Sequence, residues 1–433
     1  MLNRVHIKDI VSEDGKQILI KSSIQTIREQ GKIVFLILRD ISGICQAIVK
    51  EGSSEFDCAK RLTIESAVEI SGIVKTTKNT EKGYEILVEG IKILNESATP
   101  LPIPVVEKGD IVTTEKRQDN RFLIWRREKE SLILKIVSQL DSSYRNFLLG
   151  ENFIEIHTPK LMPSPSESSA ELFELEYFDR TAYLAQSPQL YKQMAISSGL
   201  ERVFEVGPVF RAEKSQTNRH ATEFVSYDVE MGYIDNFEEV LVMLENLVKS
   251  ILESINERYS EEIKLHYGVE NFTFSSKIPR LTMAEAKSIL KERGLDISDD
   301  DLSTAEEKAI GDYVKEKYDH DFVFITDYPT SCRPFYHKRK NDDITASSDL
   351  IYKGVEIVTT AQREENYETL LEQLNDKGLE QKPMQWYLDF FKYGCPPHGG
   401  WGFGASRLIM NLLGLESIRD VSFLYRSPTR LTP

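Results

Sequence analysis

The segment VFRAEKSQTNRHATEFVSYDVEM (209–231) decides the fold of the larger part of this chain. It predicts two strands joined by a polar loop, and side chains alternate between the two faces of a strand. Arg211 and Glu213 therefore share one face of the first strand. The second strand has an apolar face (Val225, Tyr227, Val229 and Met231) opposite a face that holds Phe224, Ser226, Asp228 and Glu230. The face with Asp228 and Glu230 is suited to line a cleft. The alternative is that this face is a solvated sheet surface.

Upstream, the segment AQSPQLYKQMAISSG (185–199) has the start and stop signals of a short helix. Ser187 suits the N-cap, Pro188 the first helical position and Gly199 the helix end. Gln189 and Lys192 are three residues apart, so they lie on one helix face. A single helical lysine is usually solvated, so this pattern alone assigns Lys192 no function.

Downstream, the segment SSDLIYKGVEIVTTAQRE (347–364) predicts a hairpin whose turn lies at residues 352–354. The hairpin would bring the carboxylates of Asp349 and Glu356 together as oxygen ligands for Mg²⁺. Arg363 follows directly behind it.

The segment HGGWGFGASRLIMNLLGLESIRD (398–420) has glycines at 400, 402 and 404, before a helical pattern that places Arg407 in the first helical turn. Glycine at alternate strand positions leaves room for a flat ligand or for a close backbone. The segment does not match the phosphate loop G-x-x-x-x-G-K-[ST].

The N-terminal part is different in character, because residues 15–95 read as five short strands rich in Ile and Val. They lie at 17–24, 32–40, 43–51, 66–77 and 84–94. Five strands in so short a stretch predict a small barrel such as the OB-fold, which often binds single-stranded nucleic acid. A purely structural β-domain is the alternative.

The predicted organisation is a barrel domain at 1–98, a proline-rich linker at 99–116 and an α+β domain at 117–433. Within the second domain we expect a long amphipathic helix at 122–148. Residues 237–320 hold mostly helical patterns and read as a lobe inserted between two halves of a sheet.

The composition of the 433 residues is that of an ordinary globular protein, with a net charge of −15. The first 100 residues carry 14 basic and 14 acidic side chains, so the acidic excess lies in the second domain. No apolar run reaches the length of a membrane helix, and no secretory signal is evident, so we expect a cytoplasmic protein with no membrane partner. The four cysteines form no CxxC pair, which disfavours a zinc site or a disulfide framework.

Together these segments resemble the class II aminoacyl-tRNA synthetases, and among them the aspartyl enzymes of the archaeal and eukaryotic type. GENFIEIHTPKLM (150–162) resembles motif 1, FRAE…RHATEF (210–224) motif 2, and GWGFGASRL (400–408) motif 3. The segment QSPQLYKQ (186–193) is similar to the aspartate-selecting segment of the family. The resemblance covers nearly the whole chain.

The resemblance implies an N-terminal OB-fold β-barrel that reads the anticodon, and a catalytic domain with an antiparallel sheet flanked by helices. It also implies a homodimer with Pro159 at its interface. The implied reaction joins L-aspartate to tRNA in two steps, through an aspartyl-adenylate made from ATP with release of pyrophosphate.

The resemblance also assigns residues to each ligand. The implied catalytic residues are Arg211 and Arg407. The implied ATP-binding residues are Arg211, Glu213, Arg219, His220, Phe224, Glu356, Gly404 and Arg407. The implied aspartate-binding residues are Glu167, Gln189, Lys192, Asp228 and Arg363, of which Lys192 and Arg363 would clamp the side-chain carboxylate. The implied Mg²⁺ ligands are Asp349, Glu356 and Thr359, and the implied anticodon-contacting residues are Arg28, Phe35 and Gln46.

Several positions depart from the family pattern. Ser168 and Ser169 replace glycines in the loop after motif 1, Thr360 replaces a glycine, and Ser406 replaces an acidic residue. Two alternatives stay open: a paralogue that binds aspartate and ATP without charging tRNA, and an asparaginyl enzyme. Lys192 disfavours the asparaginyl enzyme, because asparaginyl relatives lack that lysine. Whether tRNA(Asp) alone or tRNA(Asn) as well is the substrate stays open too.

Overall fold

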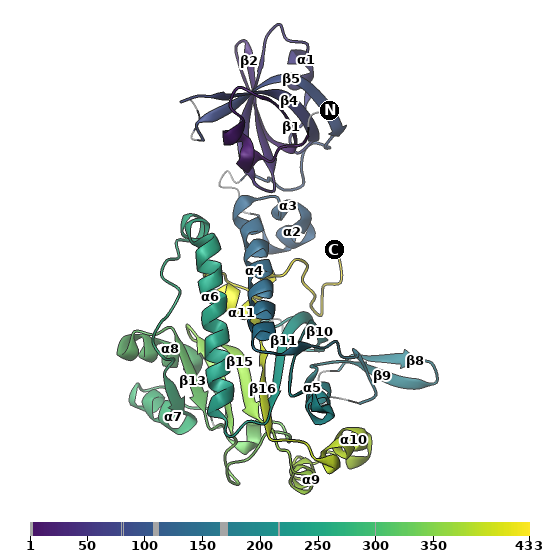
Figure 1. Ribbon diagram of the computed structural model, residues 1–433, viewed down its shortest axis with the longest axis vertical. Helices are drawn as coiled ribbons and strands as arrows, with labels where there is room; N and C mark the ends of the chain where they lie inside the picture. The colour runs from purple at the N-terminus through teal and green to yellow at the C-terminus, as the bar shows by residue number, and fades with distance from the viewer. Residues whose placement is uncertain are drawn as a thin grey trace. The chain divides into compact units, whose positions relative to one another are not determined.

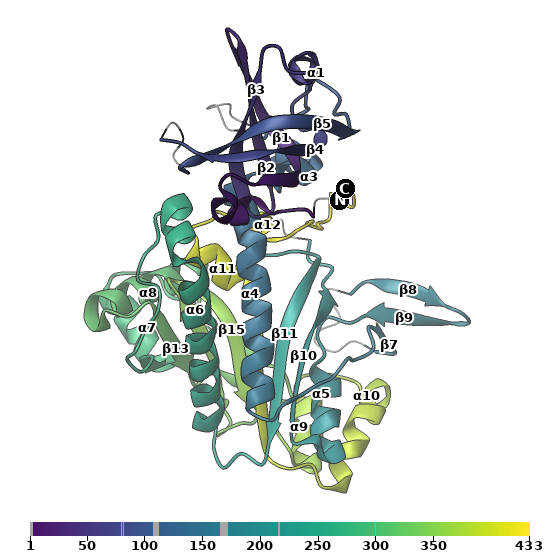
Figure 2. The ribbon, with the colours of Figure 1, turned by 45° about the horizontal axis from the view of Figure 1, so that its top comes forward.

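The chain divides into two units, Met1–Ser131 and Leu132–Pro433. The computed structural model describes residues 3–78, 80, 82–106, 112–164, 172–214, 217–298 and 300–433. Figures 1 and 2 label the helices and strands of both units. Among the described residues, none of the helices combines the length and the apolarity that crossing a bilayer requires.

The first unit contains a closed five-stranded barrel with the strand order β1-β2-β3-β5-β4, which confirms the five predicted strands. Inward and outward residues alternate along most of β1, β2 and β4, and the inward Ile, Leu and Val side chains form the core. The bounds are β1 (Gln17–Gln30), β2 (Ile33–Asp40), β3 (Gly43–Lys50), β4 (Ala67–Thr76) and β5 (Tyr84–Asn95), with a 3₁₀ segment at Ile7–Glu13 and helix α1 at Phe56–Arg61.

The predicted helix at 122–148 is interrupted, and the first unit extends past the predicted barrel boundary at 98. The chain forms α2 (Thr114–Asp119) and α3 (Arg121–Ile124), and α4 begins only at Glu128. At the break, Arg126 donates to the buried carboxylate of Glu65 at 2.9 Å. Arg127 donates to the carbonyl of Pro104 at 2.7 Å. The pattern of apolar residues gives no sign of these polar contacts. They hold residues 126 and 127 against the barrel unit.

The second unit is built on an eight-stranded sheet with the order β12-β13-β14-β15-β16-β11-β10-β6. Its central pairs are antiparallel, and only the edge strands β6 and β12 pair in parallel. This confirms the predicted α+β class. The bounds are β6 (Ile154–Glu155), β10 (Arg202–Phe210), β11 (Glu223–Gly232), β12 (Arg280–Thr282), β13 (Phe322–Thr326), β14 (Ser347–Tyr352), β15 (Val355–Gln362) and β16 (His398–Phe403).

Two long helices, α4 (Glu128–Gly150) and α6 (Glu238–Tyr267), lie side by side over one face of this sheet (Figures 1 and 2). The amide of Gln139 on α4 donates to Ser254 on α6 at 2.6 Å. The Tyr144 ring packs edge-on against Tyr227 of β11, with centroids 5.2 Å apart. The apolar face predicted for 224–231 is therefore the face under α4. Val225 is the exception, because it is 48% exposed near the strand start.

The segment 237–320 lies in sequence between β11 and β13, as expected for an insertion. Besides α6 it holds α7 (Met283–Glu292) and α8 (Thr304–Tyr318), each of which begins at a capping box. It is not purely helical, because β12 adds a strand to the edge of the sheet. The predicted lobe thus supplies both a sheet edge and the helix that covers the sheet face.

The remaining elements surround the ends of the sheet. Ser187 accepts a hydrogen bond from the backbone of Gln189. Helix α5 begins at Gln189, one residue after the predicted first helical position, Pro188. The bounds are α5 (Gln189–Ala195) with a π-helical turn at Ile196–Leu200, β7 (Leu161–Met162), β8 (Glu174–Tyr177), β9 (Arg180–Leu184), α9 (Tyr367–Asp376), α10 (Gln381–Leu388), α11 (Ala405–Leu412), α12 (Ile418–Val421), and 3₁₀ segments at Thr330–Cys332 and Asp389–Tyr393.

Candidate active site

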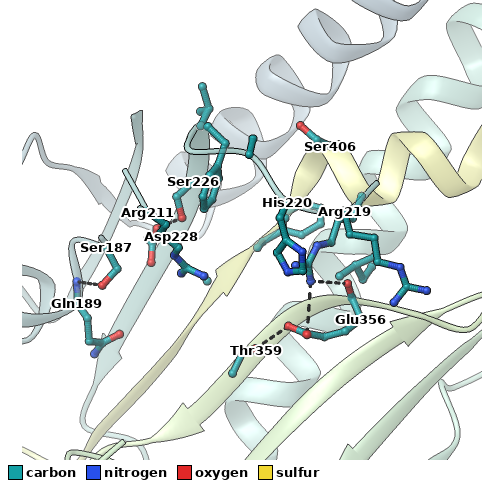
Figure 3. Close-up of a pocket in the computed structure, with 18 of the residues that line it drawn as sticks. Ser187, Gln189, Arg211, Arg219, His220, Ser226, Asp228, Glu356, Thr359 and Ser406 are labelled. Atoms are coloured by element: carbon teal, nitrogen blue, oxygen red, sulfur yellow. Dashed lines mark hydrogen bonds and ion pairs between the residues drawn. The ribbon is translucent and has the colours of Figure 1, made fainter. Parts of the chain in front are cut away.

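A cavity of about 270 Å³ lies over the polar face of β11 in the second unit. Its walls come from segments far apart in sequence, and Figure 3 shows their side chains around a common space. The cavity gathers most of the site residues expected from sequence: Gln189, Arg211, Glu213, Arg219, His220, Phe224, Asp228, Glu356, Thr359, Arg363, Gly404 and Arg407.

The loop after β10 forms one wall of the cavity. β10 ends at Phe210, so Arg211 and Glu213 belong to the loop and not, as predicted, to the strand. The guanidinium carbon of Arg211 lies 5.4 Å from the centre of the Phe224 ring. A cation and an aromatic ring at this separation stabilise each other, and they can hold a flat, anionic ligand.

The glycines of β16 allow its backbone to approach β11 closely. Gly400 pairs with Glu230, and a Cβ there would lie 2.0 Å from the carbonyl oxygen of Val229. Gly402 pairs with Asp228 and, like Gly404, lines the cavity. The sequence suggested that these glycines allow either close backbone packing or space for a ligand. Gly400 allows the close packing, whereas Gly402 and Gly404 leave space for a ligand.

Four basic side chains, Arg211, Arg219, His220 and Arg407, line the cavity, and we call this group the basic end. Arg219 forms an ion pair with Glu307 of α8 at 2.7 Å. Arg407 lies 3.4 Å from the carboxylate of Glu356 and donates to its backbone carbonyl at 3.1 Å. These groups can bind the negative charge of a phosphate chain.

The predicted hairpin between β14 and β15 is confirmed, with Lys353 and Gly354 both at positive φ in its turn. Asp349 accepts a hydrogen bond from Arg333 at 2.6 Å, and its other oxygen is buried without a partner among the described residues. Glu356 accepts from the Thr359 hydroxyl at 2.9 Å (Figure 3). Only Glu356 and Thr359 of the three predicted metal ligands line the cavity, because Asp349 lies below its surface.

Burial raises the pKa of Asp349 to about 6, with the negative charge of Glu356 adding to the shift and Arg333 opposing it. Burial also opposes ionisation of Glu356, but Arg407, the Thr359 hydroxyl and further arginines outweigh it and lower that pKa. As the pH falls, Glu356 therefore stays ionised longer than Asp349. Among the described residues, no cluster of three His, Cys, Asp or Glu side chains could hold a metal by itself.

Four ionic side chains form a buried charge cluster: Lys192, Asp228, Glu230 and Arg363. Arg363 donates through Nε to one oxygen of Glu230 at 3.0 Å and through Nη2 to the other at 3.4 Å. The Lys192 ammonium lies 3.1 Å from Asp228 and 3.4 Å from Glu230. Burial opposes ionisation of Glu230, but Arg363 and then Lys192 and His398 outweigh it and lower its pKa. The cluster is a balanced pair of cations and anions.

Lys192 differs from its expected place. It is 2% exposed and does not line the cavity, and its ammonium also donates to the carbonyls of Trp401 and Val229. A buried ammonium needs partners on every side, and Asp228 and Glu230 on β11 are the nearest anions. Arg363 and Asp228 face the cavity, and Lys192 supports Asp228 from beneath.

Sequence reasoning missed several residues of the site. Glu230 was placed on the polar strand face but given no function, although its spacing of two from Asp228 was the available signal. Arg333, Tyr336 and His337 line the cavity from an irregular segment in which no periodicity points to a site. Of the family departures, Ser406 lines the cavity, whereas Thr360 of β15 is fully buried and does not line it.

Glu167, with Ser168 and Ser169, falls outside the described residues. Pro159 is exposed in an extended segment, next to Thr158, whose hydroxyl donates to the buried carboxylate of Glu205 at 2.6 Å. Pro159 is thus accessible for contact with another chain.

The three expected anticodon residues share the outer surface of the barrel. Arg28 of β1 lies directly opposite Phe35 of β2, and Gln46 of β3 is one diagonal step away. Phe35 lies between the inward residues Val34 and Leu36 and is not part of the barrel core. The alternative in which Phe35 is a core residue is therefore wrong.

Comparison with known proteins gives matches over both units. Residues 113–427 match the family described as tRNA synthetases class II (D, K and N), and residues 18–94 match the OB-fold nucleic acid binding domain. The chain is 41% identical to the aspartate–tRNA(Asp/Asn) ligase of Aeropyrum pernix, with 100% of both chains covered. It is 40% identical to the aspartate–tRNA(Asp) ligase of Pyrococcus furiosus, with 99% of this chain and 100% of that one covered.

Solved structures give the same fold. The chain superposes on the asparaginyl-tRNA synthetase from Pyrococcus horikoshii complexed with asparaginyl-adenylate, with a TM-score of 0.92, 33% identity and 100% of both chains covered. It superposes on the aspartyl tRNA synthetase from Entamoeba histolytica with a TM-score of 0.89 and 33% identity, covering 100% of this chain and 93% of that one.

Proposed function

The chain belongs to the tRNA synthetases of class II (D, K and N), and we propose that it joins L-aspartate to tRNA in two steps through an aspartyl-adenylate. One observation carries the proposal for the site. A single cavity is lined both by the basic end with the Phe224 ring and by Arg363, which is held against the buried carboxylate of Glu230. The first set of side chains fits a nucleotide, and the second fits a small amino acid that bears charges of both signs.

In the first step an oxygen of the aspartate α-carboxylate attacks the α-phosphorus of ATP, and pyrophosphate leaves. The attacking carboxylate is already ionised, so no side-chain base is required. The chain therefore acts by alignment and by neutralising charge. Arg211 would contact the α-phosphate, while Phe224 stacks on the adenine and Glu213 accepts from its amino group. Arg219, His220 and Arg407 would hold the outer phosphates or the second face of the ring.

Mg²⁺ is proposed as the ion that accompanies ATP, and bound Mg²⁺ supplies positive charge to the phosphate oxygens. The donor set fits this ion, because Mg²⁺ usually takes one or two carboxylates together with water and phosphate oxygens. Glu356 would hold it, together with the hydroxyl of Thr359. The unpartnered buried oxygen of Asp349 supports a further ligand there.

For the amino acid, we propose that Arg363 binds the side-chain carboxylate. Asp228 and Gln189, with Glu167, would hold the ammonium group. Lys192 contributes by supplying positive charge directly beneath Asp228 and Glu230. An asparagine amide would bring no negative charge to the Arg363 guanidinium, which disfavours asparagine relative to aspartate as a substrate.

For the tRNA, we propose that Arg28, Phe35 and Gln46 contact the anticodon bases from the barrel surface. An exposed strand aromatic that stacks on a base is usual for OB-folds. The relatives include ligases named for tRNA(Asp) and ligases named for both tRNA(Asp) and tRNA(Asn). We further propose a cytoplasmic homodimer with Pro159 at its interface.

The test of the first step is aspartate-dependent exchange of pyrophosphate into ATP. We expect exchange with aspartate and much less with asparagine. Exchange with asparagine alone would replace the proposal by the asparaginyl alternative.

The test of the second step is charging of purified tRNA(Asp) and tRNA(Asn), each on its own. Charging of tRNA(Asp) supports the proposal, and charging of both defines a dual specificity. Exchange without charging of either tRNA would establish the paralogue that lost tRNA charging.

A further inference from the structure

His337 lines the cavity beside the buried charge cluster and is itself only 3% exposed. Its position follows from a β-bridge between residues 337 and 363. The backbone of Lys338 donates to Gln362 at 2.9 Å, and that of Glu364 donates to Tyr336 at 3.0 Å. Directly opposed residues of an antiparallel pair place their side chains on the same side. The His337 ring therefore meets the guanidinium of Arg363.

The contact defines the protonation state of the imidazole. His337 Nε2 lies 3.0 Å from Nη1 of Arg363. A guanidinium can only donate hydrogen bonds, so Nε2 must accept, which leaves the proton on Nδ1 of a neutral ring. Burial, followed by the charges of Arg363 and Arg333, places the pKa of His337 well below its usual value. All three nitrogens of Arg363 are then held, Nε and Nη2 by Glu230 and Nη1 by His337.

A neutral acceptor at this position has a consequence for charge. Glu230 already serves two cations, Arg363 and Lys192. A carboxylate in place of His337 would also hold Arg363, but it would add a second negative charge next to the guanidinium. That charge would repel a substrate carboxylate, whereas it would not repel a neutral amide.

We propose that His337 is a positioning residue that fixes Arg363 without neutralising it, and that it thereby favours a carboxylate side chain over an amide. The inference rests on the proposed function, because it concerns the amino acid that Arg363 binds. His337 thus takes part in substrate selection through Arg363, without contacting the substrate itself.

The experiment compares His337→Gln with His337→Glu, which match in shape and differ in charge. Steady-state pyrophosphate exchange gives KM and kcat for aspartate, and for asparagine, in the wild type and in both variants. The glutamine amide oxygen can accept from Arg363, so we expect a change in aspartate KM within about threefold, as for the exchange of one neutral acceptor. For His337→Glu we expect aspartate KM to rise at least about tenfold, with a smaller change for asparagine.

Three controls separate positioning from folding. KM for ATP and the thermal midpoint should stay near wild-type values in both variants. His320→Gln is a matched control, because His320 is also 3% exposed but does not line the cavity. If His337→Glu does not fold, His337→Leu replaces it, since leucine removes the acceptor without adding charge. We expect its aspartate KM to rise about threefold to tenfold.

The outcomes separate this inference from the proposed function. A wild type that shows no aspartate-dependent exchange contradicts the proposed function itself. If the wild type activates aspartate, any of three results overturns the role of His337. The first is an unchanged ratio of the KM values for aspartate and asparagine in His337→Glu. The second is an unchanged aspartate KM in His337→Leu. The third is an equal rise in aspartate KM in His337→Gln and His337→Glu.

Discussion

The buried charge cluster and the basic end of the same cavity hold their charges in different ways. The side chains of Arg363 and Glu230 are 4% and 0% exposed, whereas those of Arg219 and Arg407 are 22% and 23% exposed. The cluster is balanced within the folded chain and is almost fully buried. The ion pairs of the basic end are partly solvated, so a polyanion can replace their partners at low cost.

This difference assigns distinct tasks to the two parts of the cavity. Charges fixed in a buried site discriminate strongly between ligands, because their positions cannot adjust to a ligand of the wrong charge. Partly exposed charges can bind and release a phosphate chain repeatedly. We therefore expect substitutions in the cluster to affect stability and amino-acid selection, and substitutions at the basic end to affect the kinetics with ATP.

The largest effect is expected for Glu230→Gln. The change leaves Lys192 and Arg363 buried without the carboxylate they share, and breaking a buried ionic contact costs about 3–5 kcal/mol. Urea unfolding measures the loss, and aspartate-dependent exchange should fall with it. A loss below about 1 kcal/mol, typical of a surface pair, would contradict the distinction between the two parts.

Lys192→Ala is expected to have the next largest effect. Asp228 keeps a contact with Ser226, and Glu230 keeps Arg363, so we expect a loss of about 2–3 kcal/mol in unfolding free energy. The preference for aspartate over asparagine in pyrophosphate exchange should disappear, because half of the positive charge at this site is gone. Unchanged discrimination would show that Lys192 has only a structural function.

Acidification should destabilise the cluster region through two buried histidines. Burial lowers the pKa of both His337 and His398 from the usual 6.5. A histidine whose pKa is lower in the folded chain than in the unfolded chain contributes fully to the free energy of unfolding at a pH above its unfolded pKa. That contribution is lost as the pH falls below about 6.5.

Each histidine can contribute up to about 1.4 kcal/mol per pH unit in this range. Denaturant unfolding of the wild type between pH 7 and pH 5 measures the slope. His337→Gln should have a shallower slope than the wild type. Equal slopes would mean that the His337 ring is already protonated in the folded chain.

The smallest effect is expected for Glu307→Gln at the basic end. The substitution removes the partner of Arg219, and a partly exposed pair contributes about 1 kcal/mol or less to stability. KM for ATP should fall slightly, because Arg219 no longer has to leave an ion pair. A tenfold rise in KM for ATP would show instead that Glu307 holds Arg219 in its working position.

Local patterns predicted the elements whose contacts are local. The five barrel strands, the hairpin turn at Lys353–Gly354 and the buried face of β11 follow from alternation and turn chemistry, and all are confirmed. The helix break before Glu128 was not predicted, because Arg126 is held there by Glu65, which is 61 residues away in sequence. The inward position of Lys192 was missed for the same reason.

The sequence by itself determined the fold class, the strands and most of the residues that surround the cavity. Strand alternation and helix capping depend on residues that are close in sequence, so they can be recognised without a structure. The family motifs can be recognised in the same way, because the spacing of their residues is fixed. Only the tertiary structure decided which of these charges are buried together, and that His337 shares Arg363 with Glu230. Burial and distance between segments set the strength and the partner of each charge, and neither is encoded in local spacing.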